Sequence, residues 1–240
     1  MTVFGSLLST FANLNRKNIL ELLNVTSSTM TDLAKKLEIS NSEVSRHLSM
    51  LSEHGFVIKN ARDNKYSISA FGRLSLTVVK PLDFIFSHKQ FFENHILTTL
   101  EEDFVKTLDS LSDSELIEGT GKVMMNIKQA FDETKERALI MTDQMLPFGK
   151  EEISCKYLVI PEMVKYSENV PQTVEIEGAA YLNDLPLGLL ILDNKKALVF
   201  FKNLNNEMDY NCCFIVEDER GLRWINKVWE FYWKKAKKVL

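Results

Sequence analysis

Side chains that donate and accept hydrogen bonds recur at helical spacing in the segment "SNSEVSRHLSML", residues 40–51. At about 100° per residue, one side of such a helix carries Ser42, Ser45, Arg46 and Ser49, and the opposite side carries Val44, Leu48 and Leu51. Short hydroxyl side chains allow close approach to phosphates and base edges, and Arg can donate two parallel hydrogen bonds to guanine. A merely solvated face would more often carry Glu and Lys. The pattern therefore favours a helix that binds in a DNA major groove.

The elements around this segment would hold it as the third helix of a small bundle. Ser40 and Glu43 have the spacing of a capping box, which predicts that the helix begins near Asn41. Two short amphipathic helices precede it, with apolar faces formed by Ile19, Leu22 and Leu23 and by Leu33, Ala34 and Leu37. The three-residue break "EIS" is typical of the corner of a helix-turn-helix, and Gly55 can end the third helix.

Two short strand patterns, "FVIK" and "YSIS", follow Gly55 and are joined by "NARDN". They predict a β-hairpin wing with Arg62 at its tip and Lys59 and Lys65 at its base. Cations on a hairpin beside a recognition helix contact the flanking DNA backbone, which contributes affinity more than sequence choice.

The charge of the chain is unevenly distributed. The 240 residues carry a formal net charge of −4. Residues 1–80 hold ten Lys and Arg against six Asp and Glu, a balance of +4, whereas residues 81–240 hold nineteen against twenty-seven, a balance of −8. Because polyanion binding depends on the local field, the acidic total is compatible with a front domain that binds nucleic acid.

The segment "LAKKLEISNSEVSRHLSMLSEHGFVIKN", followed by "YSIS", resembles the winged-helix domain of the ArsR-like prokaryotic transcriptional regulators. The resemblance implies a homodimer that binds double-stranded DNA. It also implies that Asn41, Ser42, Ser45, Arg46 and Ser49 face the groove and that Arg62 lies in the wing. The Cys-rich ligand motifs of the metal-sensing members are missing here, so metal sensing is not carried over.

The stretch "AFGRLSLTVVKPLDFIFSHKQFFENHILTTL" is strongly apolar and predicts long helices, broken or kinked at Pro81. Its aromatic side chains need a partner surface. We expect this surface to be the same stretch of a second chain, and burial against the C-terminal half is the alternative. His88 and His95 lie one heptad apart without a carboxylate or Cys in register, which favours a helical surface or interface over a metal site.

From about residue 113 strand and helix patterns alternate, beginning with the βαβ-like series "SELIEG", "GKVMMNIKQAFDETKE" and "RALIMTD". Further strand patterns are "ISCKYLVI", "TVEIEG", "AAYLN", "LGLLILD", "ALVFFKN" and "YNCCFIVED", and the chain ends in an amphipathic helix. If the first two strands pair in parallel, their carboxyl ends form a crevice that can hold a small ligand. The candidate ligand-binding residues are Glu118, Thr120, Lys122, Thr142, Asp143 and Gln144. Loop residues that cap a helix and solvate a sheet edge are the alternative.

Signatures of common enzymes are missing from this half: there is no G-x-S-x-G, His-x-Lys, H-E-x-x-H or C-x-x-C sequence. The sequence therefore predicts no enzyme, no catalytic residue, no cofactor and no metal site. Cys155, Cys212 and Cys213 form no even disulfide framework, and the adjacent pair is typical of a buried strand. A redox or thiophilic-metal sensor is the alternative, although no third ligand lies nearby in the sequence.

The segments "LSDSELIEGT", "DLPLGLLILDNKKALVFF" and "WINKVWEFYWKKAKK" resemble the C-terminal domain of archaeal winged-helix regulators of the methanogenesis-regulator type. The expected fold is α+β: an N-terminal winged helix-turn-helix (residues 1–70), linking or dimerisation helices (71–112) and a C-terminal α/β sensor-like domain with a mixed sheet (113–240).

The expected function is that of a transcriptional regulator that binds a palindromic operator as a homodimer and senses a small-molecule effector or a partner. Two alternatives stay open: a winged helix that binds another protein, and a DNA-tethered enzyme that uses Asp143 and Glu118 as a carboxylate pair. No apolar run approaches the roughly 18 to 20 residues of a membrane span, and the N-terminus lacks the features of a signal peptide. We therefore expect a cytoplasmic protein with no membrane partner.

Overall fold

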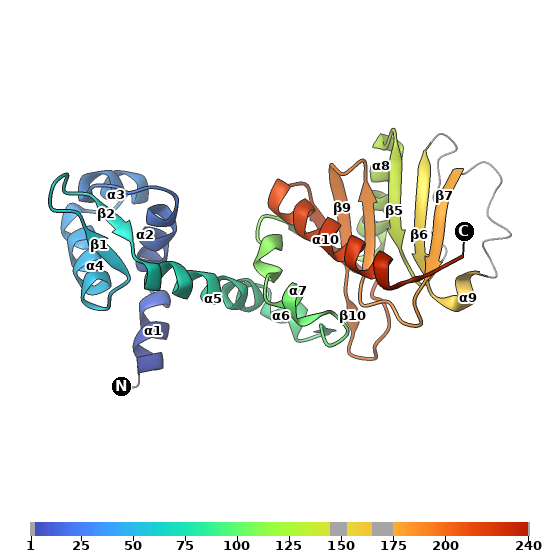
Figure 1. Cartoon of the computed structure of the whole chain (residues 1–240), viewed down its shortest axis with the longest axis horizontal. Coiled ribbons are helices and arrows are strands. Elements are labelled where there is room, and N and C mark those ends of the chain that lie inside the picture. Colours follow the sequence, from blue (N-terminus) through green and yellow to red (C-terminus); the bar gives the residue numbers. More distant parts are fainter. Residues whose placement is uncertain (1–2, 145–152, 165–174, 240) are drawn as a thin grey trace. The chain divides into compact units, whose positions relative to one another are not determined.

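The computed structural model describes residues 3–144, 153–164 and 175–239 and divides the chain into two compact units, residues 1–83 and 84–240 (Figure 1). The fold is α+β, as the sequence predicts: the first unit is mainly helical, and the second is built on a mixed sheet. The division between the units falls inside a helix, whereas the sequence-based boundaries lie at residues 70 and 112.

The N-terminal unit is a helical bundle with a β-hairpin. Its described elements are α1 (Val3–Phe11), α2 (Leu14–Val25), α3 (Met30–Leu37), α4 (Asn41–Glu53), β1 (Val57–Lys59), β2 (Tyr66–Ile68) and most of α5 (Ala70–Ser87). The sequence patterns do not predict α1. The fully buried centre is formed by Ile19, Leu20, Leu33, Val44 and Leu51, so the helices α2, α3 and α4 all contribute to it. Of the residues expected on the apolar faces, Leu22 and Leu37 are only partly buried, and Leu20 takes an inward position that the sequence reasoning does not assign to it.

The start of α5 lies against the turn that precedes the hairpin. A Cβ atom built on Gly72 would lie 2.2 Å from the carbonyl oxygen of Phe56, so only glycine fits at this position. Phe56 itself is 2% exposed, and the hydroxyl of Ser69 bonds the carbonyl of Gly55. This close approach fixes where α5 leaves the unit.

The helices expected beyond residue 70 end earlier than the sequence predicts. α5 contains Pro81 and continues to Ser87, and a single turn, α6 (Lys89–Phe92), follows. His95 and Ile96 then form a short strand, β3, because their backbone pairs with β10 (Lys202–Asn203). The expectation of a helix at His95 is therefore wrong: a strand pairing far along the chain overrides the local apolar pattern.

The C-terminal unit contains one eight-stranded sheet with the order β12-β7-β6-β5-β8-β9-β11-β4 (Figure 1). Its strands are β4 (Glu115–Glu118), β5 (Arg137–Met141), β6 (Ser154–Val159), β7 (Glu175–Tyr181), β8 (Gly188–Leu192), β9 (Lys196–Phe200), β11 (Cys212–Val216) and β12 (Lys237–Lys238). The pairs β5–β6 and β6–β7 are parallel, and the other pairs are antiparallel. The mixed sheet confirms the expected class.

The pairing of "ELIEG" with "ALIMTD" on which the expected crevice depends does not occur. β4 pairs with β11 at one edge of the sheet, and β5 pairs with β6 and β8 in its interior. The strands β8, β9 and β11 lie between them. The three antiparallel strands that follow later in the sequence insert at this place, which the local βαβ-like pattern does not reveal.

Helices cover both faces of this sheet (Figure 1). α8 (Thr120–Glu133) buries Val123, Ile127 and Phe131, and α10 (Glu219–Lys235) buries Leu222, Ile225, Trp229 and Tyr232, as the helical spacing predicts. The remaining described elements of the unit are α7 (Glu102–Val105), the 3-10 helix η1 (Leu108–Leu111) and α9 (Pro161–Val164). Because both faces are covered, β8 and β11 are buried along their whole length.

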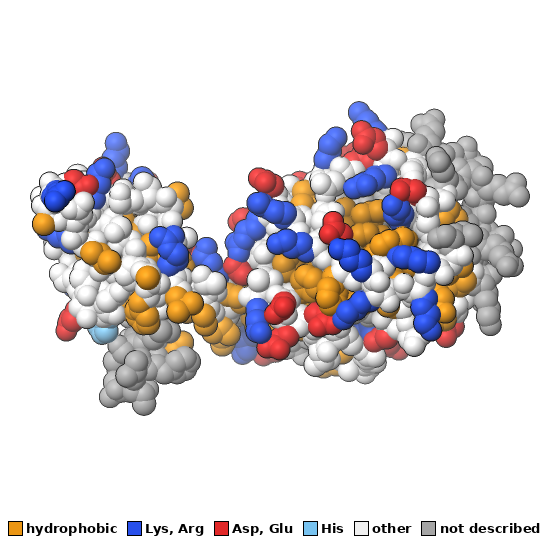
Figure 2. Space-filling view, in the orientation of Figure 1, with side chains coloured by type: hydrophobic (Ala, Val, Ile, Leu, Met, Phe, Trp, Pro, Cys, Tyr) orange, Lys and Arg blue, Asp and Glu red, His pale blue; other side chains and the backbone are white. Residues whose placement is uncertain are grey.

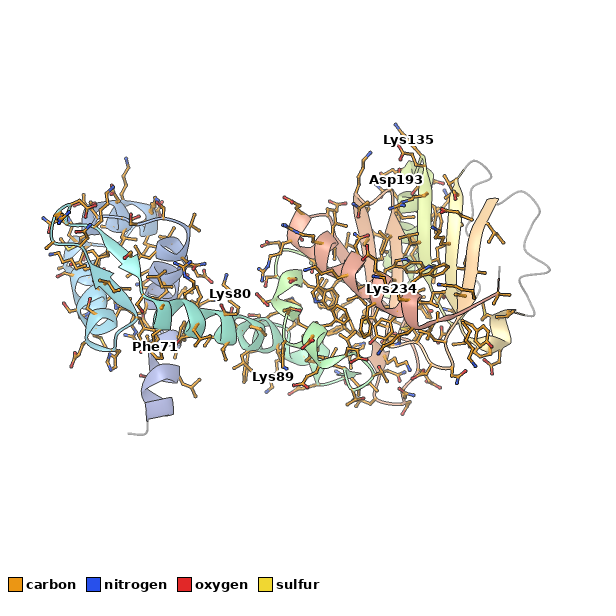
Figure 3. All side chains as sticks on the ribbon, in the orientation of Figure 1. Phe71, Lys80, Lys89, Lys135, Asp193 and Lys234 are labelled. Atoms are coloured by element: carbon orange, nitrogen blue, oxygen red, sulfur yellow. The ribbon has the colours of Figure 1, made fainter. Side chains whose placement is uncertain are left out.

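The turn between β8 and β9 also fixes the start of β5. Asp193 adopts a left-handed conformation with φ of 49°. Its carboxylate accepts hydrogen bonds from the backbone N–H groups of Lys135, Glu136 and Arg137 at 2.8 to 2.9 Å, and Figure 3 shows Asp193 and Lys135 at the same end of the sheet.

No described helix has the length and apolar composition needed to cross a membrane.

Candidate functional site

α4 begins at a reciprocal cap formed by Ser40 and Glu43, as the sequence predicts. The backbone N–H of Glu43 donates to the Ser40 hydroxyl at 3.2 Å, and the backbone N–H of Ser40 donates to the Glu43 carboxylate at 3.4 Å. α3 begins with the same arrangement at Thr29 and Asp32. Between the two helices Glu38 adopts a left-handed conformation, φ 55°, which turns the chain sharply.

The two sides of α4 differ as expected. Val44, Leu48 and Leu51 are at most 1% exposed and pack into the bundle. The side chains on the other side are all exposed, and they are Asn41, Ser42, Ser45, Arg46 and Ser49. Among the described contacts of this set is one between the hydroxyls of Ser42 and Ser40 at 3.0 Å. The helix therefore presents a small polar surface with one guanidinium group.

His47 is a buried residue of α4 that the sequence reasoning does not single out. It is 3% exposed, and its Nδ1 atom has no hydrogen-bond partner within the described structure. Burial, followed by the nearby charges of Arg46 and Arg16, lowers the pKa of His47. The residue is thus held in its neutral form, and its position at i+3 from Val44 is the signal that marks it as inward-facing.

The hairpin predicted after Gly55 is present, with Val57 opposite Ile68 and Lys59 opposite Tyr66. Its backbone also pairs with the chain at Ser28, whose N–H and carbonyl both bond Tyr66, an addition that the sequence does not predict. The turn closes through a bond from the Asn60 N–H to the Lys65 carbonyl at 2.8 Å. The wing is therefore fixed to the bundle at Ser28, while its own turn bond closes the hairpin.

The three cations expected on the wing, Lys59, Arg62 and Lys65, are all exposed. The ammonium group of Lys59 lies 5.5 Å from the centre of the Tyr66 ring. Figure 2 shows Lys and Arg side chains on the end of the N-terminal unit formed by α3 and the wing. Flexible exposed cations beside a polar helix suit contact with phosphates.

The six candidate ligand-binding residues form two groups at one end of the C-terminal sheet. Glu118, Thr120 and Lys122 lie at the end of β4 and the start of α8, and Thr142, Asp143 and Gln144 follow β5. The carboxyl ends of β4 and β5 point the same way, but three strands separate them. At about 4.8 Å per strand this is roughly 19 Å. The carboxylate pair of Glu118 and Asp143 proposed for an enzyme is therefore not formed.

The segment before β11 joins the two groups. The Tyr210 hydroxyl contacts the Thr142 hydroxyl at 2.9 Å and donates to the Asp143 carboxylate at 2.7 Å. Next to it, Asn211 accepts hydrogen bonds from the Thr120 hydroxyl and, through its carbonyl, from the Gly119 N–H at 2.8 Å. Tyr210 and Asn211 were missed because nothing near them in the sequence indicates that this loop crosses the end of the sheet.

Comparisons with known proteins bear mainly on the N-terminal unit. Residues 14–59 match the family described as bacterial regulatory protein, arsR family. The search of curated proteins found no match. Two solved structures show similarity at low identity. TrmBL2, an archaeal chromatin protein, is 16% identical over 89% of this chain and 88% of its own, with a TM-score of 0.39. NucT from Helicobacter pylori is 10% identical over 52% and 98%, with a TM-score of 0.40.

The match spans α2, α3, α4 and β1, which are the elements that build and position the exposed polar surface. Residues 14–59 of this chain therefore match the arsR family as a helix-turn-helix segment, and β2 completes the β-hairpin wing beyond the match.

Proposed function

We propose that this protein is a DNA-binding transcriptional regulator in which α4 binds the major groove. The observation that carries the proposal is the division of α4 into a buried aliphatic side and an exposed side of Asn41, three serines and Arg46. The arsR-type match over the same residues supports a regulatory, DNA-binding role. In this arrangement Arg46 contacts a guanine edge and Lys59, Arg62 and Lys65 contact phosphates beside the groove.

A second copy of the chain is the proposed partner on the exposed side of α5. Phe71, Leu74, Val78 and Leu82 recur at three- and four-residue steps and are 48%, 64%, 61% and 43% exposed. Figure 2 shows apolar side chains gathered along α5, and Figure 3 marks Phe71 at its start. An apolar stripe on a helix that directly follows the wing supports a two-fold dimer that spans two half-sites of a palindromic operator.

The later part of the apolar stretch that begins at Ala70 packs on the C-terminal unit, which was the alternative to a second chain. Phe84 and Phe91 are 3% and 5% exposed and pack on Phe214 of β11 in the C-terminal unit. Only the part of the stretch before residue 83 therefore supports dimer formation.

For the C-terminal unit we propose a sensory role. The polar groups that Tyr210 and Asn211 connect offer hydrogen bonds to a small molecule or to a partner at one end of the sheet. A ligand that favours one arrangement of the dimer would shift the separation of the two α4 helices and so change operator affinity.

The test is selection of bound fragments from random double-stranded DNA, followed by affinity measurements at several salt concentrations. We expect a palindromic consensus, a steep loss of affinity with salt, and weaker specific binding by Arg46→Ala. The control is Arg223→Ala, which removes an exposed Arg of α10 whose described ion pair is with Glu219. No enriched sequence, or equal binding by Arg46→Ala and wild type, would remove the proposal and favour a winged helix that binds protein.

A further inference from the structure

His95, Asp209 and Cys212 meet at the end of the C-terminal sheet, although His95 lies more than one hundred residues from the other two. The Nε2 atom of His95 is 3.3 Å from Sγ of Cys212 and 3.3 Å from Oδ2 of Asp209, and Sγ of Cys212 is 3.6 Å from the same Oδ2. His95 and Cys212 are buried, and Asp209 is half-buried. The sequence predicts no metal site at His95 because no carboxylate or Cys lies in register with His88 and His95; the structure brings both kinds of group to His95.

The orientation of the His95 ring is fixed by its other nitrogen. Nδ1 lies 2.7 Å from the Phe91 carbonyl oxygen, which can only accept, so Nδ1 carries the proton. The ring also stacks on Phe91, with centres 3.8 Å apart and planes 9° apart. In the neutral imidazole Nε2 therefore presents its lone pair to Cys212 and Asp209. A backbone carbonyl on the far nitrogen is the usual arrangement for a histidine that binds a metal.

The carboxylate of Asp209, like the ring of His95, is oriented by hydrogen bonds to the atom that faces away from the cluster. Its Oδ1 atom accepts hydrogen bonds from the backbone N–H and the side-chain amide of Asn211, both at 2.8 Å. This leaves Oδ2 directed at His95 and Cys212. The group therefore offers Oδ2 as a ligand atom, while its other oxygen is already satisfied.

With His95 in its neutral form, hydrogen bonds cannot satisfy all three groups at once. One thiol proton can be donated to Nε2 or to Oδ2, and the other acceptor then faces a lone pair at 3.3 Å. Glu118, opposite Cys212 in the antiparallel pair, adds a further carboxylate on the same side of the sheet.

The three spacings fit a metal ion. A tetrahedral zinc ion with bonds of about 2.0 to 2.3 Å holds nitrogen, oxygen and sulfur ligands about 3.3 to 3.6 Å apart. We propose that His95, Asp209 and Cys212 bind one Zn²⁺-like transition-metal ion, with a fourth position open to water or an external ligand. The site lies wholly within the C-terminal unit and does not rest on the DNA-binding role.

The chemical types of the three ligands restrict which metal ions can bind. An imidazole, a thiolate and a carboxylate together suit zinc and neighbouring transition metals and suit neither Mg²⁺ nor Ca²⁺, which take oxygen ligands. Binding replaces the thiol proton of Cys212, which is released to solvent. An open fourth position is a feature of metal sites that exchange a ligand, whereas closed structural sites have four protein ligands.

The experiment uses the full chain, stripped of metal under reducing conditions and titrated with Co²⁺ and then Zn²⁺. We expect one Co²⁺ per chain, a thiolate-to-cobalt charge-transfer band, visible bands of tetrahedral intensity, and displacement of Co²⁺ by Zn²⁺. Cys212→Ser should abolish the charge-transfer band, and the nearly isosteric Asp209→Asn should weaken binding by at least roughly tenfold. Asn211→Ala, which keeps all three ligands, should weaken it by roughly 10- to 100-fold.

Cys213→Ala is the matched control. Cys213 is adjacent and fully buried, but it points to the opposite face of β11, so the variant should bind metal as wild type does. Circular dichroism checks that each variant is folded. Failure of the folded wild-type chain to take up Co²⁺ or Zn²⁺ would overturn the proposal and leave a hydrogen-bonded cluster. Equal binding by Cys212→Ser and wild type would also overturn it. Neither outcome depends on whether the chain binds DNA.

Discussion

Ser40 and Glu43 satisfy each other's backbone N–H groups at the start of α4, directly beside the residues proposed to face DNA. Removing the hydroxyl in Ser40→Ala should cost about 1 kcal/mol of folding stability, because one N–H of the first turn loses its acceptor. The first turn carries Asn41 and Ser42, so the variant should also bind DNA more weakly. Urea denaturation and fluorescence anisotropy with labelled DNA measure the two effects.

Thr29→Ala provides the comparison, since Thr29 and Asp32 form the same reciprocal cap at the start of α3. We expect a similar loss of stability from this variant with a smaller loss of DNA affinity. Equal losses of affinity in the two variants would mean that the first turn of α4 has no special role.

Arg46 and Arg62 should differ in what they contribute to binding. Arg46→Ala should cost about 1 to 3 kcal/mol on the selected sequence and relax the preference at one base pair. Arg62→Ala should weaken binding on all sequences alike and reduce the dependence of log K on log salt by about one. Titrations of specific and scrambled DNA at several salt concentrations separate the two. If log K of Arg62→Ala depends on log salt as steeply as that of wild type, the wing does not contact DNA through Arg62.

Leu74→Asp should prevent dimer formation with little effect on folding. Leu74 is 64% exposed, and substitutions at such positions usually change stability by no more than about 0.5 kcal/mol. Sedimentation should show a monomer, and binding to a two-half-site operator should weaken more than binding to a single half-site. Met125→Asp is the control, because Met125 of α8 is 73% exposed and should leave the oligomeric state unchanged. A wild-type chain that sediments as a monomer contradicts the prediction.

The N-terminal unit should lose stability in mild acid because of His47. Burial and the charges of Arg46 and Arg16 lower its pKa in the folded state below the ordinary histidine value of 6.5. The folded state therefore favours neutral His47, and this contribution is fully present above pH 6.5 and is lost as pH falls through the folded pKa. Thermal denaturation across this range should show a smaller acid loss for His47→Leu. An identical pH profile in the variant would assign the effect to other groups.

Helical spacing along the sequence correctly identified the buried sides of α4 and α8. The inward set Val44, Leu48 and Leu51 follows from positions four and three residues apart along α4, and the same reasoning places Val123 and Ile127 of α8 in the core. The same reasoning failed at His95, which the apolar pattern assigns to a helix. There the backbone hydrogen bonds to Asn203, more than one hundred residues away, decide the conformation.

By itself the sequence determined the bundle, its caps, the wing and the polar side of α4, because a helical period and a capping box involve residues within about one or two turns. Only the tertiary structure decided that three strands separate β4 from β5, that Phe84 and Phe91 pack on Phe214, and that His95 lies against Asp209 and Cys212. The order of strands in a sheet and the side-chain contacts across it depend on segments that are distant in the sequence. The periodicity of a short segment carries no information about them.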